Sequence, residues 1–202
     1  FLANNGYAVL QPEYRGSLGY GLEHWKIAYG EGGLKMQDDK DDGALWLVEQ
    51  GIADADRLAM FGWSYGGYAA AVAASRDPNI YQCTIAGAAV VDGNMQLNYY
   101  RDGLLPASEY WELQRREGIQ PLDEVEKVNI PLMIIHGDVD QRVPFEHFEK
   151  YTKALDKAGV DYKAVVLKGA DHFYNTLFYE HQIKLYTEMR DFLQNDCGPG
   201  GL

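Results

Sequence analysis

Residues 62–66, with the sequence GWSYG, place a serine between two glycines in the pattern G-x-S-x-G. An apolar segment typical of a strand, Leu58–Trp63, ends just before the serine, and an alanine-rich segment typical of a helix, Tyr68–Ala74, follows it. A sharp turn from strand to helix strains the serine backbone and exposes its hydroxyl, and the flanking glycines let the strand and helix crowd together. The pattern predicts Ser64 as a nucleophile toward a carbonyl carbon, with the Tyr65 backbone N–H donating to the oxyanion.

A serine hydroxyl is a weak nucleophile until an adjacent base takes its proton, and histidine is the usual base. Of the five histidines in the chain, His172 lies in a short glycine-containing loop after an apolar segment, Tyr162–Leu167. We therefore predict His172 as the base. The other four precede the serine, end a predicted strand or fall in predicted helices, where packing or structural hydrogen bonds are expected: His24, His136, His147 and His181.

An acidic loop, residues 137–144 with the sequence GDVDQRVP, follows the apolar segment Leu132–His136. In this type of site the acid follows the serine and precedes the histidine along the chain. Loops at the carboxyl ends of parallel strands also lie where open α/β sheets bind ligands. The residues alone do not decide whether Asp138 or Asp140 orients the base. Asp138 could instead stabilise a turn, and so could Asp171, which precedes the histidine.

Apolar segments alternate with amphipathic ones along the chain, which predicts an α/β fold with a mostly parallel sheet and helices on both faces. Residues 93–129 break the alternation, and we expect a helical excursion over one sheet edge. Residues 195–202 are expected to form a flexible tail. The predicted strands are Tyr7–Gln11, Leu58–Trp63, Cys83–Val91, Leu132–His136 and Tyr162–Leu167, and the predicted helices are Asp42–Gln50, Tyr68–Ala74, Phe145–Ala158 and Leu177–Leu193.

The composition restricts the possible partners. The 202 residues suit one domain and carry a net charge of −12 without a basic block, which argues against nucleic acid and anionic membranes as partners. An acidic run, residues 38–43, is close to a calcium loop, but Lys40 occupies a ligand position and an acidic helix start is favoured. We predict no metal and no cofactor. The two cysteines, Cys83 and Cys197, are expected to be a buried thiol and a tail thiol, with a disulfide between them as the alternative.

The sequence resembles the catalytic domain of the prolyl oligopeptidase family of serine peptidases, in its acylaminoacyl-peptidase and dipeptidyl-aminopeptidase-like branch. The motifs that carry the resemblance occur in family order over nearly the whole chain: PEYRGSLGYG at 12–21, GWSYGGY at 62–68, HGDVDQRVP at 136–144 and GADHF at 169–173. The resemblance implies an α/β-hydrolase fold and a catalytic triad of Ser64, Asp140 and His172. It thereby favours Asp140 over Asp138.

The resemblance also implies residues that contact substrate. Arg142, two residues after the acid, would hold a substrate carbonyl, although a salt bridge within the loop is an equal alternative. The Tyr65 side chain and some of four further residues would line the S1 pocket. For those four, core packing is at least as good an interpretation: Val90, Val91, Tyr99 and Tyr100.

Two features of the family are missing from these residues. Family members carry an N-terminal β-propeller, and an HGGP-like loop supplies a second oxyanion donor. We therefore expect a C-terminal part of the catalytic domain, with a strand missing between those at Tyr7–Gln11 and Leu58–Trp63, which would be a weak catalyst by itself. The implied function is hydrolysis of short peptides through an acyl-enzyme. A carboxylesterase on the same fold and a non-catalytic, hydrolase-like binding module are the alternatives.

Overall fold

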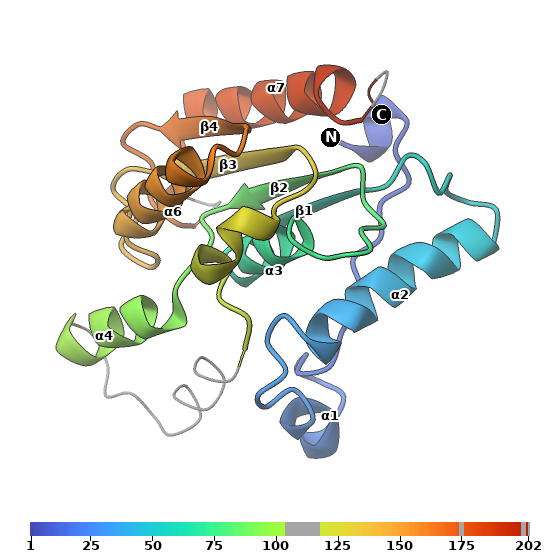
Figure 1. The fold of residues 1–202 in the computed structure, drawn as a ribbon, viewed down its shortest axis with the longest axis horizontal. Coiled ribbons are helices and arrows are strands. Elements are labelled where there is room, and N and C mark those ends of the chain that lie inside the picture. The colour runs from blue at the N-terminus through green and yellow to red at the C-terminus, as the bar shows by residue number, and fades with distance from the viewer. Residues whose placement is uncertain (104–117, 174–175, 199–200, 202) are drawn as a thin grey trace. The chain divides into compact units, whose positions relative to one another are not determined.

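The computed structural model describes residues 1–103, 118–173, 176–198 and 201. The chain divides into two compact units, residues 1–55 with 93–119 and residues 56–92 with 120–202 (Figure 1). The second unit contains the sheet, and the first contains short helices and one long helix.

Four parallel strands form the sheet in the order β1-β2-β3-β4. Its two central strands are buried along their whole length, as expected for strands covered on both faces. The four strands end at the same edge of the sheet, because Trp63 pairs with Gly87, and Gly137 pairs with Leu167. Their bounds are β1 Ala59–Trp63, β2 Cys83–Gly87, β3 Leu132–Gly137 and β4 Tyr162–Leu167.

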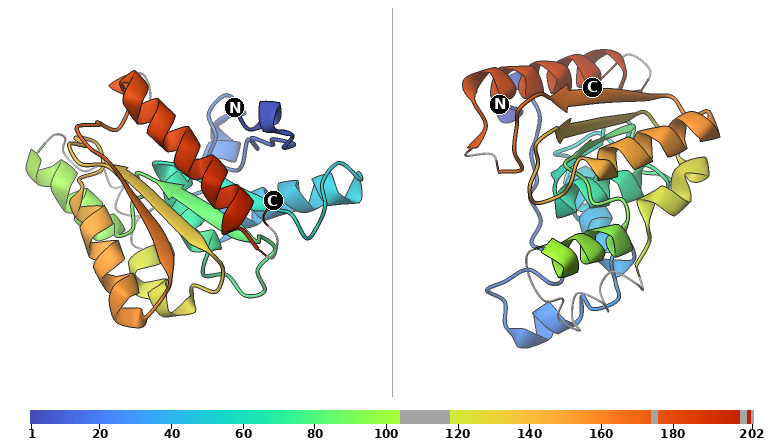
Figure 2. Two further views of the ribbon diagram at one scale, coloured as in Figure 1. Left: turned by 90° about the horizontal axis from the view of Figure 1, so that it is seen from above. Right: turned by 90° about the vertical axis from the view of Figure 1, so that its left-hand side faces the viewer.

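Helices lie on both faces of this sheet (Figure 2). Helices α3 (Tyr65–Ala73) and α6 (Glu146–Ala158) lie on one face, and α7 (Tyr179–Asn195) lies on the other. The bounds of α6 agree with the prediction. The helix ends before Gly159, which has the left-handed conformation typical of a helix C-terminus. The α/β-hydrolase expectation of a parallel sheet between helices is confirmed.

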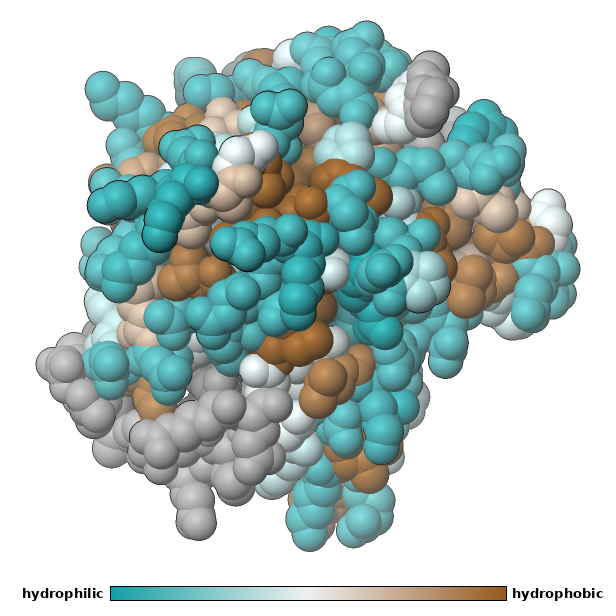
Figure 3. All heavy atoms as spheres, in the orientation of Figure 1, coloured by the Kyte–Doolittle hydropathy of each residue, from teal (hydrophilic) through white to brown (hydrophobic). Residues whose placement is uncertain are grey.

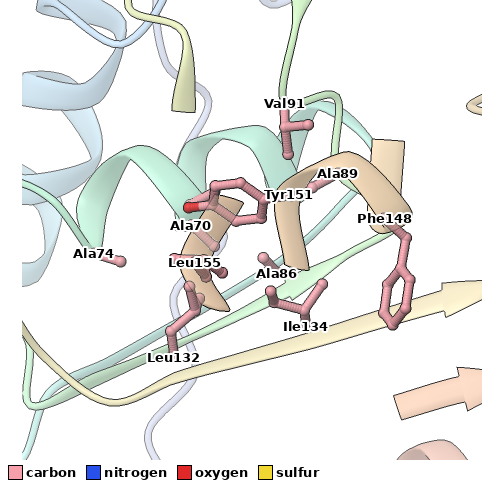
Figure 4. Packing of buried hydrophobic residues seen from close by; sticks show 11 residues of the cluster. Ala70, Ala74, Ala86, Ala89, Val91, Leu132, Ile134, Phe148, Tyr151 and Leu155 are labelled. Carbon is pink, nitrogen blue, oxygen red and sulfur yellow. The ribbon is translucent and has the colours of Figure 1, made fainter. Parts of the chain in front are cut away.

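The core between α3, α6 and the sheet combines small and large side chains (Figure 4). Alanines on α3 and β2, such as Ala70 and Ala86, let the helix and sheet approach each other closely. Large side chains from α6 and β3, such as Tyr151, Leu155 and Leu132, fill the remaining space and are almost fully buried. Burial of one such leucine contributes about 1.5–3 kcal/mol, so this cluster stabilises the packing of α3 and α6 on the sheet.

The first unit contains a 3-10 helix and three α-helices among its described residues: η1 (Ala3–Asn5), α1 (Leu22–Lys26), α2 (Lys35–Glu49) and α4 (Gly93–Gly103). An ion pair inside this unit joins the Arg15 Nη2 to the Asp39 Oδ1 at 2.6 Å. The neighbouring Lys40 ammonium lies 3.4 Å from the centre of the Tyr14 ring, and burial lowers the pKa of Lys40 to about 8. The helix predicted at Asp42–Gln50 begins earlier, at Lys35, so the acidic run lies inside α2 and only Asp38 falls in its first turn.

The predicted strand at Tyr7–Gln11 is wrong, since these residues have no regular secondary structure. A strand forms only when a neighbouring strand accepts and donates its backbone hydrogen bonds, and this segment pairs with no described strand. The segment therefore does not pair with β1 as a strand. Of the predicted excursion, α4 and the 3-10 helix η2 (Pro121–Lys127) are helical, and residues 104–117 lie outside the described residues.

The expectation of two free thiols is also wrong. Cys83, at the start of β2, and Cys197, just after α7, form a disulfide with their Cα atoms 5.1 Å apart. The two cysteines are 114 residues apart in sequence, so their spacing gives no sign of this proximity, which arises because α7 packs across the sheet. Cys197 is fully buried, so the predicted tail is anchored at this residue, while residues 199, 200 and 202 lie outside the described residues.

Hydrophilic residues cover much of the face shown in Figure 3, including the area over α6 and η2, with hydrophobic residues between them. Among the helices that the structure describes, none has both the length and the hydropathy needed to cross a bilayer.

Candidate active site

Ser64 occupies a strained turn between β1 and α3. Its backbone has φ 61° and ψ −116°, a positive φ that is uncommon for a residue with a side chain and costs on the order of 1–3 kcal/mol. Two backbone hydrogen bonds hold the turn: the Ser64 N–H donates to the Gly87 carbonyl at 2.9 Å, and the Ser64 carbonyl accepts from the Tyr68 N–H at 3.0 Å. The predicted strand–turn–helix context of the serine is thus present.

The Ser64 side chain does not serve the helix that it precedes. A serine at the first boundary position of a helix usually accepts a hydrogen bond from the helix backbone. Ser64 occupies this position before α3 but makes no such side-chain bond. The next residue, Tyr65, begins α3, where backbone N–H groups lack acceptors within the helix and the helix dipole favours negative charge. This local arrangement suits a nucleophile with an oxyanion donor beside it.

Two glycines make the tight turn possible. A Cβ atom at Gly62 would lie 2.1 Å from the Gly66 carbonyl oxygen, and one at Gly67 would lie 2.1 Å from the Gly87 carbonyl oxygen. The predicted role of Gly62 is confirmed. The same role predicted for Gly66 is wrong, because a Cβ atom there would have open space, and Gly67 has that role instead. The doubled glycine in GWSYGG was the signal that could have identified it.

Asp140 and His172 form a direct hydrogen bond. The His172 Nδ1 lies 2.7 Å from the Asp140 Oδ2, and the two side chains are 5% and 0% exposed. The other carboxylate oxygen, Oδ1, accepts the backbone N–H groups of Arg142 and Val143 at 2.8 and 2.7 Å. The contact therefore involves Asp140, and the alternative acid, Asp138, has a different partner.

The surroundings of Asp140 keep its carboxylate ionised. Burial by itself raises the pKa of this group, but hydrogen bonds from His136, from His172 and from the Val143 N–H outweigh burial and hold the pKa well below its ordinary value. A buried carboxylate that is charged and fixed on one side by backbone donors can orient an imidazole and stabilise its protonated form.

His136 is the second imidazole near this carboxylate. Its Nε2 lies 2.9 Å from the Val143 carbonyl oxygen, so this nitrogen carries the proton, and it lies 3.5 Å from the Asp140 Oδ2. The expected structural hydrogen bond of His136 is confirmed. Sequence reasoning did not predict that His136 also lies close to the Asp140 carboxylate. The signal was the HGDVD sequence, which places the two residues only four positions apart at the end of β3.

Two further aspartates join the acid loop to the His172 loop. The Asp138 carboxylate accepts the Gly169 N–H, and the Asp171 carboxylate accepts the Gln141 N–H at 3.0 Å. Because each loop supplies one aspartate and one backbone donor, the loops hold each other in register. Both aspartates therefore brace turns, which was the alternative interpretation of these residues.

The elbow that contains Ser64 is adjacent to the His172 loop. Trp63, the residue before the serine, donates its indole N–H to the His172 carbonyl oxygen at 2.8 Å. The structure thus brings together three segments that are far apart in sequence: the elbow, the acid loop and the histidine loop. All three lie at the carboxyl edge of the sheet, as predicted from the position of each segment after a strand.

The residues predicted to contact substrate lie in different environments. The Arg142 side chain is exposed, and Tyr65 and Val90 are half-buried. Val91 is 1% exposed within the core cluster, which favours core packing. Tyr99 and Tyr100 belong to α4 in the first unit. Among the residues described, no group of three or more histidine, cysteine or acidic side chains is arranged to hold a metal ion.

Comparison with known proteins identifies the family. The sequence model of the prolyl oligopeptidase family matches residues 1–200. Dipeptidyl aminopeptidase BIII of Pseudoxanthomonas mexicana is 32% identical over 187 residues, which are 85% of this chain and 27% of that protein. Human prolyl endopeptidase FAP is 27% identical over 195 residues, 95% of this chain and 25% of that protein. The chain spans about a quarter of the length of these curated relatives.

Solved structures show the same fold. An acylaminoacyl peptidase of Pyrococcus horikoshii superposes with a TM-score of 0.77 at 21% identity, covering 91% of this chain and 31% of that one. The relatives also include the inactive dipeptidyl peptidase 10 of Rattus norvegicus, which is 29% identical over 84% of this chain and 22% of that protein. Activity must therefore be argued from the residues of the site.

Proposed function

This chain belongs to the prolyl oligopeptidase family, and on that premise we propose that it is the part of a serine peptidase that cleaves peptide bonds of short peptides. One observation carries the proposal. The Asp140–His172 hydrogen bond of 2.7 Å lies beside the strained turn that presents Ser64. Together these residues have the acid, base and nucleophile roles that acyl transfer requires.

In the first half of the proposed reaction, the Ser64 Oγ attacks the peptide carbonyl carbon while the His172 Nε2 takes the hydroxyl proton. Asp140 accepts the Nδ1–H of His172, which fixes the tautomer and stabilises the imidazolium that forms. The tetrahedral oxyanion accepts the Tyr65 N–H at the start of α3. The second oxyanion donor would come from residues outside this chain.

In the second half, the imidazolium gives its proton to the leaving amine, and the C–N bond breaks to leave an acyl group on Ser64. His172 then takes a proton from a water molecule, which attacks the acyl carbon. Collapse of the second tetrahedral intermediate returns the proton to the Ser64 Oγ and releases the carboxylic acid. No step of this mechanism needs a metal or a redox group.

The substrates and partners belong to the proposal as well. Relatives named dipeptidyl aminopeptidase and acylamino-acid-releasing enzyme support short peptides as substrates. The exposed side chain of Arg142 would bind a substrate carbonyl next to the triad. Because these relatives are about four times longer than the match, we propose a longer parent protein in which an N-terminal β-propeller controls access to the site.

Labelling of the full-length protein with a fluorophosphonate tests the nucleophile. We expect the label on Ser64, and we expect Ser64→Ala to lower kcat by about 10³-fold or more. Ser75→Ala is the matched control, because the hydroxyl of this serine bonds the Val72 carbonyl near the end of α3. A protein that is folded but neither labelled nor active would be a binding module. Higher kcat/KM for short acyl esters than for aminoacyl amides would instead indicate a carboxylesterase.

A further inference from the structure

The indole of Trp63 connects the two segments whose relative position sets the proposed proton transfer. Its N–H donates to the His172 carbonyl oxygen at 2.8 Å across 109 residues of sequence. We propose that Trp63 is a positioning residue, which holds the His172 loop in register with the nucleophile elbow through this hydrogen bond. The inference rests on the proposed function, because it assigns a role in the reaction of Ser64 and His172.

Gly87 contacts both the Trp63 indole and the backbone of Ser64. A Cβ atom at Gly87 would lie 2.2 Å from the Trp63 Cε3, so the indole lies directly on the Gly87 backbone. The carbonyl of the same glycine accepts the Ser64 N–H at 2.9 Å, and Gly87 pairs with Trp63 in the β1–β2 ladder. The indole and the Ser64 backbone are therefore held by one residue. A group bonded to the indole is fixed relative to the serine.

Several hydrogen bonds between the histidine loop and the acid loop fix the imidazole relative to the acid. The Asp140 carboxylate holds the Nδ1 side of the imidazole, and the bracing bonds of Asp138 and Asp171 join Gly169 and Gln141. These bonds all lead to the acid loop. The Trp63 bond leads to the elbow, so it controls the distance from the His172 Nε2 to the nucleophile. A displacement of about 1 Å at such a site can cost about 10²-fold in rate.

The action of Trp63 depends on its hydrogen bond more than on contact between the rings. The Trp63 and His172 rings are 6.5 Å apart between centroids and tilted by 53°, so they are not stacked. Trp63→Phe keeps an aromatic ring on Gly87 but removes the N–H donor. If Trp63 only packed against β2, this change would affect stability and leave the chemical step nearly unchanged.

The test is Trp63→Phe in the full-length protein. We expect kcat to fall by about tenfold to 10²-fold with little change in KM, because the loss occurs in the transition state. Trp46→Phe is the matched control, since it makes the same change on a half-exposed position of α2 in the other unit and should leave kcat unchanged. An unchanged kcat in Trp63→Phe overturns the inference.

A second measurement separates positioning from general damage. In a His172→Ala background, measured with an activated aryl ester, the loss caused by Trp63→Phe should disappear, because the residue acts through His172. If the losses of kcat caused by His172→Ala and by Trp63→Phe instead multiply in the double variant, the inference is overturned. If Trp63→Phe does not fold, a benzothienyl analogue of tryptophan keeps the ring shape without the donor, and normal kcat in that protein overturns the inference. Activity retained by Ser64→Ala would instead refute the proposed function.

Discussion

Two carboxylates, Asp140 and Asp39, each meet a basic side chain at nearly the same distance. The Asp140 Oδ2 lies 2.7 Å from an imidazole nitrogen, and the Asp39 Oδ1 lies 2.6 Å from a guanidinium nitrogen. Arg15 bonds both oxygens of Asp39 and is always protonated, so this pair carries fixed charges. An imidazole, unlike a guanidinium, has a ring nitrogen that can accept a proton. The partner, and not the distance, makes one contact structural and the other suitable for proton transfer.

The two pairs also differ in how far their side chains are exposed to water. The side chains of the Arg15–Asp39 pair are each 23% exposed, so water screens the charges. The Asp140 side chain is completely buried, and its Oδ1 is held by backbone N–H groups that leave Oδ2 for the imidazole. A proton-transfer site thus needs a carboxylate that is both charged and unable to rotate.

Replacement of each carboxylate by its amide should give the largest contrast. We expect Asp140→Asn to lower kcat by about 10⁴-fold, because the amide no longer selects the required tautomer of His172. We expect Asp39→Asn to leave kcat close to that of the unmodified protein. Steady-state kinetics on both variants, with circular dichroism to confirm folding, checks the contrast. Similar losses of kcat in the two variants would show that the Asp140–His172 contact has no special role in catalysis.

Replacement of His136, the second imidazole near the Asp140 carboxylate, should lower kcat less than replacement of Asp140 does. His136→Phe removes the Nε2–H that lies 3.5 Å from the Asp140 Oδ2, and we expect kcat to fall by about tenfold. His136→Gln can place an amide N–H in the same direction and should recover part of the loss. If the two variants lose the same activity, the contribution of His136 is packing alone.

Acid unfolding should distinguish the buried carboxylate from its amide. Hydrogen bonds that overcome burial lower the pKa of Asp140 in the folded protein, so the stability that it contributes is present above the unfolded pKa of about 3.9. This contribution is lost as the pH falls toward the folded pKa. Between about pH 5 and pH 3, the unmodified protein should therefore lose more unfolding free energy than Asp140→Asn. Denaturant titrations at several pH values measure this difference, and parallel pH curves would contradict it.

The exposed pair should give the smallest effect. Asp39→Asn should lower the free energy of unfolding by about 1 kcal/mol, because a partly exposed ion pair contributes little in water. The loss should shrink further at high salt, where the charges are screened. Chemical denaturation at low and high ionic strength checks this, and a loss that does not depend on salt would show that packing dominates.

The outcomes at particular residues show how far sequence patterns reach. The G-x-S-x-G pattern predicted the turn at Ser64, and the order of the loops predicted the region of His172. The choice between Asp138 and Asp140 came from the family resemblance, since both lie in one short loop. The Cys83–Cys197 disulfide and the Trp63–His172 hydrogen bond join positions 114 and 109 residues apart, and no local pattern reports such contacts.

The sequence by itself determined the local features of this protein: the alternation of strands and helices, the strained turn at Ser64 and the loops that carry an acid and a histidine. These follow from periodicity and from turn-forming residues, which act over a few positions. Only the tertiary structure decided that Trp63 bonds the His172 carbonyl, that Tyr7–Gln11 is not a strand and that Cys197 is buried in a disulfide. The physical reason is that hydrogen bonds and burial depend on which segments the packed sheet brings together.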